Sequence, residues 1–246
     1  MSVYTDWVLR SVNLPAVMST SPTLDPLERN TLWDRAYASL RSALMAGRFA
    51  PGQRIVLRDV AEQLDISLTP VRDAVNRLIA ERVLERGGVG QGGGATVPLL
   101  RADQFAQLMA VRASLEGAAT AEAVKNMTPA LLDKIEQALI EMERSVNDKR
   151  SVGYLEAHYR FHFNIYESCK MPIMLEMIES VWLRCAPTLR LGLPDYTPSL
   201  SRYPFHVAAF EALRDGDGER AADAVRSDIS SARDDICTLL GRTERN

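Results

Sequence analysis

The chain has 246 residues, of which 46% are hydrophobic and 25% are charged, and its formal net charge is −3. This composition is that of a globular protein and excludes a chain that is disordered along its length. No apolar run approaches the roughly 20 residues that a membrane-spanning helix needs. The first residues also lack the basic start and apolar block of a secretion signal, so we expect a cytoplasmic protein.

The charge is divided unevenly along the chain. Residues 31–98 contain 9 basic and 7 acidic residues, which leaves +2, whereas residues 99–246 contain 18 basic and 22 acidic residues, which leaves −4. The asymmetry favours nucleic-acid contact by the first part, but only slightly. Three cysteines, at positions 169, 185 and 237, lack CxxC spacing and predict buried apolar side chains rather than disulfides.

Residues 1–30 contain three prolines among several Ser and Thr residues, and we expect a partly disordered N-terminal arm there. Apolar periodicity then predicts a helix from Leu32 to Ala46, ended by Gly47. Two short helices and a glycine-rich hairpin over 87–94 follow. After Pro98 glycine becomes sparse and helical periodicity continues, which places a domain boundary near this proline. Six or seven helices are expected beyond it, roughly over 102–126, 128–148, 152–169, 171–190, 199–214 and 217–241.

The first of the two short helices has an apolar face and is followed by a residue suited to a tight turn. This face carries Leu57, Val60, Ala61 and Leu64. Asp65 follows, and Asp tolerates the left-handed conformation better than most residues. Next, Ser67 or Thr69 can cap another helix, and Pro70 suits its first turn.

The second short helix has a buried and an exposed face. Its periodicity buries Val71, Val75, Leu78 and Ile79, and it exposes Thr69, Arg72, Asn76 and Arg77. Two short helices joined by a tight turn, with polar and Arg side chains on the second, are typical of a DNA-reading helix-turn-helix. Any helical hairpin in an all-α protein can show this pattern, but the glycine-rich hairpin that follows favours a winged helix-turn-helix.

The segment GRFAPGQRIVLRDVAEQLDISLTPVRDAVNRLIAERVLER resembles the winged helix of the GntR family of bacterial regulators. The resemblance implies that Arg58, before the first helix of the motif, and Arg72, inside TPVR, contact DNA. Ser67 and Thr69 match positions that contact the DNA backbone, and Asn76 lies on the same exposed face. The chain departs from the family in having Leu68 where Arg is frequent and Asp65 where Gly is usual, and its wing lacks the usual Asn or Arg. The elements that carry the resemblance are Pro51-Gly52, Asp59-Val60-Ala61, Ser67, Thr69-Pro70-Val71-Arg72 and Leu84.

All three histidines of the chain fall on apolar helical faces. His158 and His162 are four residues apart and share one face, and His206 lies on the inward face of another helix. Asp228 lies on the apolar stripe of the last helix, where an unpaired carboxylate is costly to bury. Three imidazoles and one carboxylate from core faces of three helices can form a divalent metal site. The alternative is that the histidines are packed core residues bonded to backbone carbonyls.

Residues 99–240 resemble the FCD effector domain of FadR-type GntR regulators, in the segments VRASLEGAATAEA, HYRFHFNIYES and FHVAAFEALRDGDGERAADAVRSDI. Many such domains bind one metal with one Asp and three His. The first ligand position, usually Asp or Asn, is here His158, and the fourth, usually His, is here Asp228. His162 and His206 match the other two. The resemblance implies one divalent transition metal per chain, with zinc expected and nickel or manganese as alternatives.

Arg112 lies on an apolar helical seam, which is unusual for a charged residue. It can pair with Glu116 four residues later or extend its charged end to the surface. Alternatively, a buried guanidinium can hold a carboxylate ligand through two hydrogen bonds. In the family the matching arginine lies near the effector, which implies effector binding by Arg112.

Together these features predict a mainly α protein with an N-terminal arm (1–30), a winged helix-turn-helix (31–98) and an all-α helical bundle (99–246) that binds an effector and dimerises. We expect a repressor that binds a palindromic operator as a homodimer, with half-sites about one DNA turn, roughly 34 Å, apart. A small organic acid bound beside the metal would be its effector. One alternative is a regulator whose signal is the metal itself. A more distant alternative is a metalloenzyme whose site activates water, although the sequence places no further Glu or His beside the ligands.

Overall fold

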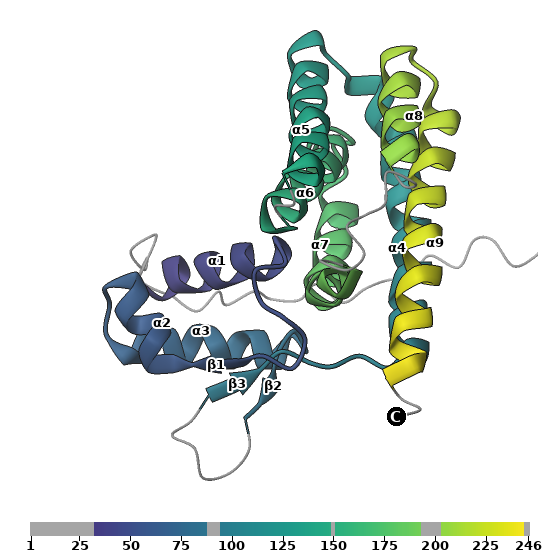
Figure 1. Cartoon of the computed structure of the whole chain (residues 1–246). Helices are drawn as coiled ribbons and strands as arrows, with labels where there is room; N and C mark the ends of the chain where they lie inside the picture. The colour runs from purple at the N-terminus through teal and green to yellow at the C-terminus, as the bar shows by residue number, and fades with distance from the viewer. Residues whose placement is uncertain (1–31, 88–93, 149–150, 193–202, 244–246) are drawn as a thin grey trace, which may run out of the picture.

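The computed structural model describes residues 32–87, 94–148, 151–192 and 203–243 (Figure 1). The expected N-terminal arm, the tip of the predicted hairpin and the start of the helix expected over 199–214 lie outside these residues. The chain has a winged-helix region, residues 32–97, and a helical region, residues 102–243. Figure 1 shows them as two bodies, with the winged-helix region beside one end of the helical one.

The winged-helix region contains three helices and a small sheet. Its elements are α1 (Leu32–Met45), β1 (Arg54–Val56), α2 (Leu57–Leu64), α3 (Leu68–Ala80), β2 (Glu85–Arg86) and β3 (Gly94–Thr96). Residues with positive φ separate the helices as expected. Gly47 follows α1 with φ +63°. Asp65 ends α2 with φ 52° and ψ 48°, and its N–H bonds to carbonyls of α2. The sequence prediction of a left-handed turn at Asp65 is therefore confirmed.

The sheet has the antiparallel strand order β1-β3-β2, with Ile55 opposite Ala95 and Glu85 opposite Thr96. Sequence reasoning expected the β2–β3 hairpin but not β1. This strand has three residues, of which only Ile55 is buried. A three-residue strand is too short to show alternation, and its pairing depends on a partner about 40 positions away.

The helical region contains six α-helices among the residues described, which agrees with the expected number. They are α4 (Ala102–Ala123), α5 (Pro129–Asn147), α6 (Ser151–Glu167), α7 (Pro172–Leu189), α8 (Tyr203–Arg214) and α9 (Gly218–Thr243), with 3-10 turns at Val124–Asn126 and Arg190–Gly192. The long helices α4 and α9 run side by side (Figure 1). Their contact is close at Gly218, where a Cβ would lie 2.7 Å from the Ala121 carbonyl oxygen. Within the described ranges, no helix is long and apolar enough to cross a membrane.

The two regions meet where α1 ends against α7. The indole N–H of Trp182 on α7 donates to the Met45 carbonyl oxygen over 3.1 Å. The Arg190 guanidinium donates to the carbonyl oxygens of Gly47 and Arg48 over 3.3 and 3.2 Å. Ion pairs also link the regions, among them Arg41–Glu179 and Arg48–Glu156. Because α1 also packs on α3, α7 is connected to the second helix of the helix-turn-helix through one intervening helix.

Candidate DNA interface and metal centre

Helix α3 presents the polar face that the sequence predicted. Val71, Ala74, Val75 and Leu78 are buried against the rest of the winged-helix region, and Ile79 is half-buried. All five residues predicted to contact DNA are exposed: Arg58, Ser67, Thr69, Arg72 and Asn76. Ser67 occupies the N-cap of α3, but its side chain makes no capping hydrogen bond. Arg58 lies in the first turn of α2 rather than before it.

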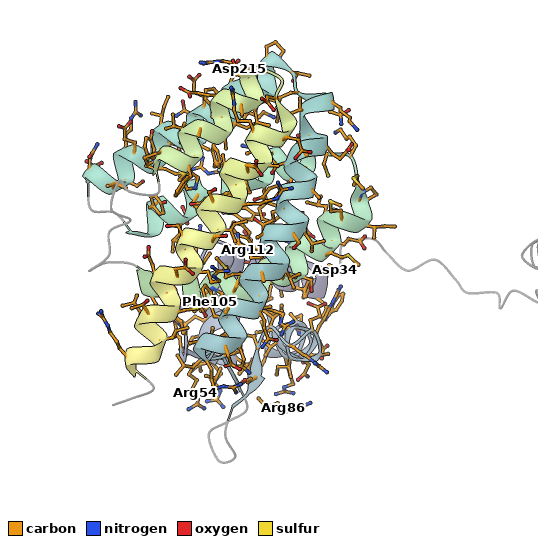
Figure 2. All side chains as sticks on the ribbon, turned by 90° about the vertical axis from the view of Figure 1, so that its right-hand side faces the viewer. Asp34, Arg54, Arg86, Phe105, Arg112 and Asp215 are labelled. Atoms are coloured by element: carbon orange, nitrogen blue, oxygen red, sulfur yellow. The ribbon has the colours of Figure 1, made fainter. Side chains whose placement is uncertain are left out.

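A groove of about 310 Å³ lies between α3 and the β2–β3 hairpin. Arg72 and Asn76 line it from α3, and Arg86 lines it from β2. Figure 2 shows Arg54 and Arg86 at the end of the molecule opposite Asp215. Sequence reasoning missed Arg86 as a candidate DNA contact, although its place just before the glycine-rich segment was a usable signal.

Arg77 is exposed beside these residues, but its guanidinium contacts other side chains of the winged-helix region. Its Nε donates to Glu81 over 2.8 Å, and its guanidinium lies 4.0 Å from the ring centroid of Tyr37 on α1. Tyr37 in turn donates to the other oxygen of Glu81 over 2.7 Å. Arg77 therefore helps to fix α1 on α3, which distinguishes it from Arg72.

His158 and His162 on α6, His206 on α8 and Asp228 on α9 converge inside the helical region. Each offers a ligand atom, and all four of these atoms lie within 4.8 Å of one another. His162, His206 and Asp228 are buried, and His158 is nearly so. The i, i+4 spacing on α6 explains why two of the imidazoles share this face.

The spacing of the four side chains matches the size of a metal ion. An ion held by imidazole nitrogens and carboxylate oxygens at about 2.0–2.2 Å keeps its ligand atoms about 3.0–3.5 Å apart. The Nε2 atoms of His158 and His162 are 3.1 Å apart. Asp228 Oδ2 lies 3.5 Å from Nε2 of His162, 3.5 Å from Nε2 of His206 and 3.9 Å from Nε2 of His158. The donor set and its spacing therefore fit a divalent transition metal.

The protonation states of His158, His162 and Asp228 also suit metal binding. Burial lowers the pKa of His158 to about 4 and lowers the pKa of His162 well below its ordinary value. Burial alone would raise the pKa of Asp228, but the surrounding histidines outweigh it and hold the pKa well below the usual range. Neutral imidazoles and an ionised carboxylate are the forms that bind metals.

Behind the cluster, a buried hydrogen-bonded chain runs from α6 to α4. The hydroxyl of Tyr166 lies 2.8 Å from Nδ1 of His162 and 2.6 Å from Oε2 of Glu116. Glu116 accepts two hydrogen bonds from Arg112, from Nε over 2.6 Å and from Nη2 over 3.1 Å. The side chains of Arg112 and Glu116 are 2% and 0% exposed.

Arg112, predicted to bind the effector, thus lies inside the bundle with an internal partner (Figure 2). Its pairing with Glu116 was one of the two alternatives that the sequence left open, and it is a buried pair rather than a surface one. The remaining nitrogen, Nη1, meets the sulfur atoms of Met109 and Cys185 at 3.5 and 3.6 Å. Burial alone would lower the pKa of Arg112, but Glu116 raises it above its ordinary value, so the guanidinium stays charged.

Trp182 connects these features and had no distinguishing signal in the sequence. Its ring lies 3.9 Å from the guanidinium carbon of Arg112. The ring centroids of His158 and His162 are 5.8 and 5.6 Å from that of Trp182. Sequence reasoning also missed Tyr166, although it continues the four-residue spacing of His158 and His162.

Comparison with known families assigns both regions. The model of the GntR family of bacterial regulatory proteins matches residues 32–97, and the FCD domain model matches residues 107–231. Both matches agree with the resemblances drawn from the sequence motifs.

Individual proteins resemble most of the chain. The HTH-type transcriptional regulator McbR of Escherichia coli K12 is 31% identical over 186 residues, which are 74% of this chain and 82% of McbR. The galactonate operon transcriptional repressor of the same strain is 24% identical and covers 81% of this chain and 94% of its own length. The solved structure of E. coli McbR/YncC superposes with a TM-score of 0.75 at 27% identity, over 87% of this chain and 99% of that one. These proteins are transcription regulators rather than enzymes.

Proposed function

Because the chain belongs to the GntR family of bacterial transcription regulators and carries an FCD domain, we propose that it is a metal-containing repressor. In this proposal a homodimer binds a palindromic operator, and a small carboxylate bound in the helical region releases it. The observation that carries the sensing part is the buried cluster of three histidines and Asp228. A relative that is named as a repressor supports the direction of regulation.

On the DNA side, we assign base contacts to Arg72 and Asn76 of α3. Arg and Asn pair with guanine and adenine edges in the major groove, and both side chains are exposed beside the wing. Arg58, Ser67 and Thr69 are assigned to the phosphate backbone, where such contacts position a protein without reading sequence. Footprinting on the DNA upstream of its own gene and of neighbouring genes should reveal two protected half-sites about one turn apart. Absence of any symmetric protected site would contradict the palindrome.

For the dimer, we propose that a second copy covers the exposed apolar side chains of two packed helices. Val111 on α4 and Ile173 and Met177 on α7 are 47%, 72% and 54% exposed, and α4 packs on α7. Contact with a second copy would bury these exposed apolar side chains, and a palindrome needs two copies of α3. Sedimentation should show a dimer that Ile173→Glu dissociates and that Leu99→Glu, at another exposed apolar position, leaves intact. A monomeric wild-type chain would overturn this assignment.

The charges around the cluster favour an anionic effector. Three neutral imidazoles and one carboxylate would hold a divalent ion with one positive charge left over. Arg112 and Glu116 neutralise each other, so they leave that charge uncompensated. A carboxylate would balance it by occupying a free coordination position of the ion. It could also accept from Arg112 Nη1, which now meets only sulfur atoms, and these are weak acceptors.

Contacts between the two regions support a route from the effector to DNA. Trp182 lies against His158 and His162 and also donates to Met45 at the end of α1. A ligand that favours one placement of Trp182 would favour one placement of α1 and α3. It changes DNA affinity only by its difference in affinity for the two arrangements.

Titration separates the proposed effector from the alternative in which the metal is the signal. Operator binding is measured with chelated protein, with protein loaded with Zn²⁺, Ni²⁺ or Mn²⁺, and with loaded protein plus a panel of small carboxylic acids. We expect a carboxylate to weaken operator binding only when metal is present, and His162→Ala to abolish this response. If operator affinity follows the metal alone, the organic acid is not the effector.

A further inference from the structure

We infer that Tyr166 and Glu116 are positioning residues of the metal site, and that Arg112 fixes Glu116 for this role. The inference rests on the proposed metal site and extends it beyond the four ligands. It assigns a function to the buried ion pair of Arg112 and Glu116. Each member acts through the next, and only His162 would touch the ion.

The geometry defines what His162 must do. Its Nε2 faces the cluster, 3.1 Å from Nε2 of His158 and 3.5 Å from Asp228 Oδ2. Its Nδ1 points away, toward the hydroxyl of Tyr166 at 2.8 Å. A neutral imidazole carries one proton, on either nitrogen. Nε2 can bind an ion only if that proton is on Nδ1, so His162 is a good ligand only in this tautomer.

The direction of each hydrogen bond follows from the buried ion pair. An ionised carboxylate only accepts, and Glu116 accepts from Arg112 through both oxygens. The Tyr166 hydroxyl, 2.6 Å from Glu116 Oε2, must therefore give its single proton to Glu116. The Tyr166 oxygen is then left to accept, and the donor facing it is Nδ1–H of His162. These successive hydrogen bonds thus fix His162 in the tautomer whose Nε2 lone pair faces the cluster.

The four side chains of this hydrogen-bonded network are buried away from bulk water. Arg112, Glu116, Tyr166 and His162 are all at most 2% exposed. The Tyr166 hydroxyl is enclosed with its two partners, Glu116 Oε2 at 2.6 Å and His162 Nδ1 at 2.8 Å. Without Arg112, the Glu116 carboxylate would lose both of the hydrogen bonds that hold it in this position.

Hydrogen-bond partners of a metal-binding histidine fix the orientation of its ring and its tautomer. Removing one such partner weakens metal affinity by about 10–100-fold. Tyr166→Phe removes only the hydroxyl and keeps the buried ring. Tyr159→Phe is the matched control, because Tyr159 lies on the same helix and its ring contacts are with Phe163 and Trp182.

The first test measures Co²⁺ affinity and the visible absorption of bound Co²⁺, using the full chain and a competing chromophoric chelator. We expect Tyr166→Phe to bind Co²⁺ about 10–100-fold more weakly with an altered spectrum, and Tyr159→Phe to match the wild type. Wild-type affinity and spectrum in Tyr166→Phe would overturn the inference. A wild-type chain that binds no Co²⁺ would overturn it together with the proposed metal site.

The second test needs no metal and separates the two proposals. ¹⁵N-histidine NMR of the chelated protein should show His162 as the Nδ1–H tautomer in the wild type. In Tyr166→Phe the Nε2–H tautomer should become populated, whereas Tyr159→Phe should leave the tautomer unchanged. A wild-type His162 in the Nε2–H form would overturn the positioning role of Tyr166 and Glu116, even if the cluster binds metal.

Discussion

The winged-helix region and the helical region use their charged side chains in opposite ways. Arg58 and Arg72 stand exposed on the surface of the first. In the second, Arg112 and Asp228 are buried among partners that the fold itself supplies. A surface residue that reads a macromolecule gains its partner only on binding, so it contributes little to folding. A buried charge needs its partner at all times, so function and stability are coupled at Arg112 and Asp228.

The largest expected effect is on the buried ion pair of the helical region. Glu116→Ala would leave the Arg112 guanidinium buried without a partner, and we expect it to lower the free energy of unfolding by about 3–5 kcal/mol. The double variant Arg112→Met/Glu116→Leu should recover most of this loss, because an apolar pair replaces both charges. Denaturant unfolding in the presence of a chelator measures both. A loss below about 1 kcal/mol for Glu116→Ala would mean that Arg112 reaches water.

An intermediate effect is expected on the winged-helix region, and on binding alone. Arg72→Ala should weaken operator binding by about 1–3 kcal/mol, which is the value of a bidentate base contact. Its free energy of unfolding should stay within about 0.5 kcal/mol of the wild type, because the side chain is exposed. Gel shifts and denaturant unfolding test the two statements. Arg160→Ala, at an exposed arginine of α6, serves as the control and should keep operator affinity.

A smaller effect is expected where the two regions meet. Trp182→Phe keeps an aromatic ring over the cluster but removes the N–H that Met45 accepts. The lost bond should cost about 0.5–1.5 kcal/mol and reduce the effect of ligand on operator affinity. Unfolding and operator titrations check both, with Trp33→Phe in α1 as the control. A full ligand response in Trp182→Phe would show that other contacts connect the regions.

The smallest effect should come from an exposed ion pair between the regions. Arg48 and Glu156 are 59% and 34% exposed, and exposed pairs contribute about 0–1 kcal/mol. Arg48→Ala should therefore change the free energy of unfolding by less than about 1 kcal/mol, and the difference should shrink at high salt. Unfolding at two salt concentrations measures it. A larger, salt-insensitive loss would show that Arg48 stabilises the structure by packing.

Local patterns explain what the sequence could predict. Three kinds of feature depend on neighbours within a few residues. They are the turn at Asp65, the end of α1 at Gly47 with the start of α5 after Thr128, and the exposed face of α3. The clustering of the three histidines with Asp228 could also be anticipated, because polar residues on apolar helical faces must meet other polar groups.

Long-range pairing explains what the sequence could not predict. Tyr166 and Glu116 are 50 positions apart, and Trp182 and Met45 are 137 apart. Nothing local tells a buried tyrosine or tryptophan which polar atom it will meet. For Arg112 the partner at i+4 was visible, but only packing decided that the pair lies inside the bundle rather than on its surface.

Trp182 also gives the protein an intrinsic fluorescent reporter beside the cluster. Its indole lies against two of the candidate ligands, whereas Trp33 stacks on Tyr37 in α1. A paramagnetic ion such as Co²⁺ quenches the fluorescence of a tryptophan only a few ångströms away far more strongly than that of a distant one. The emission of Trp182 should therefore report filling of the cluster in solution, without any added label.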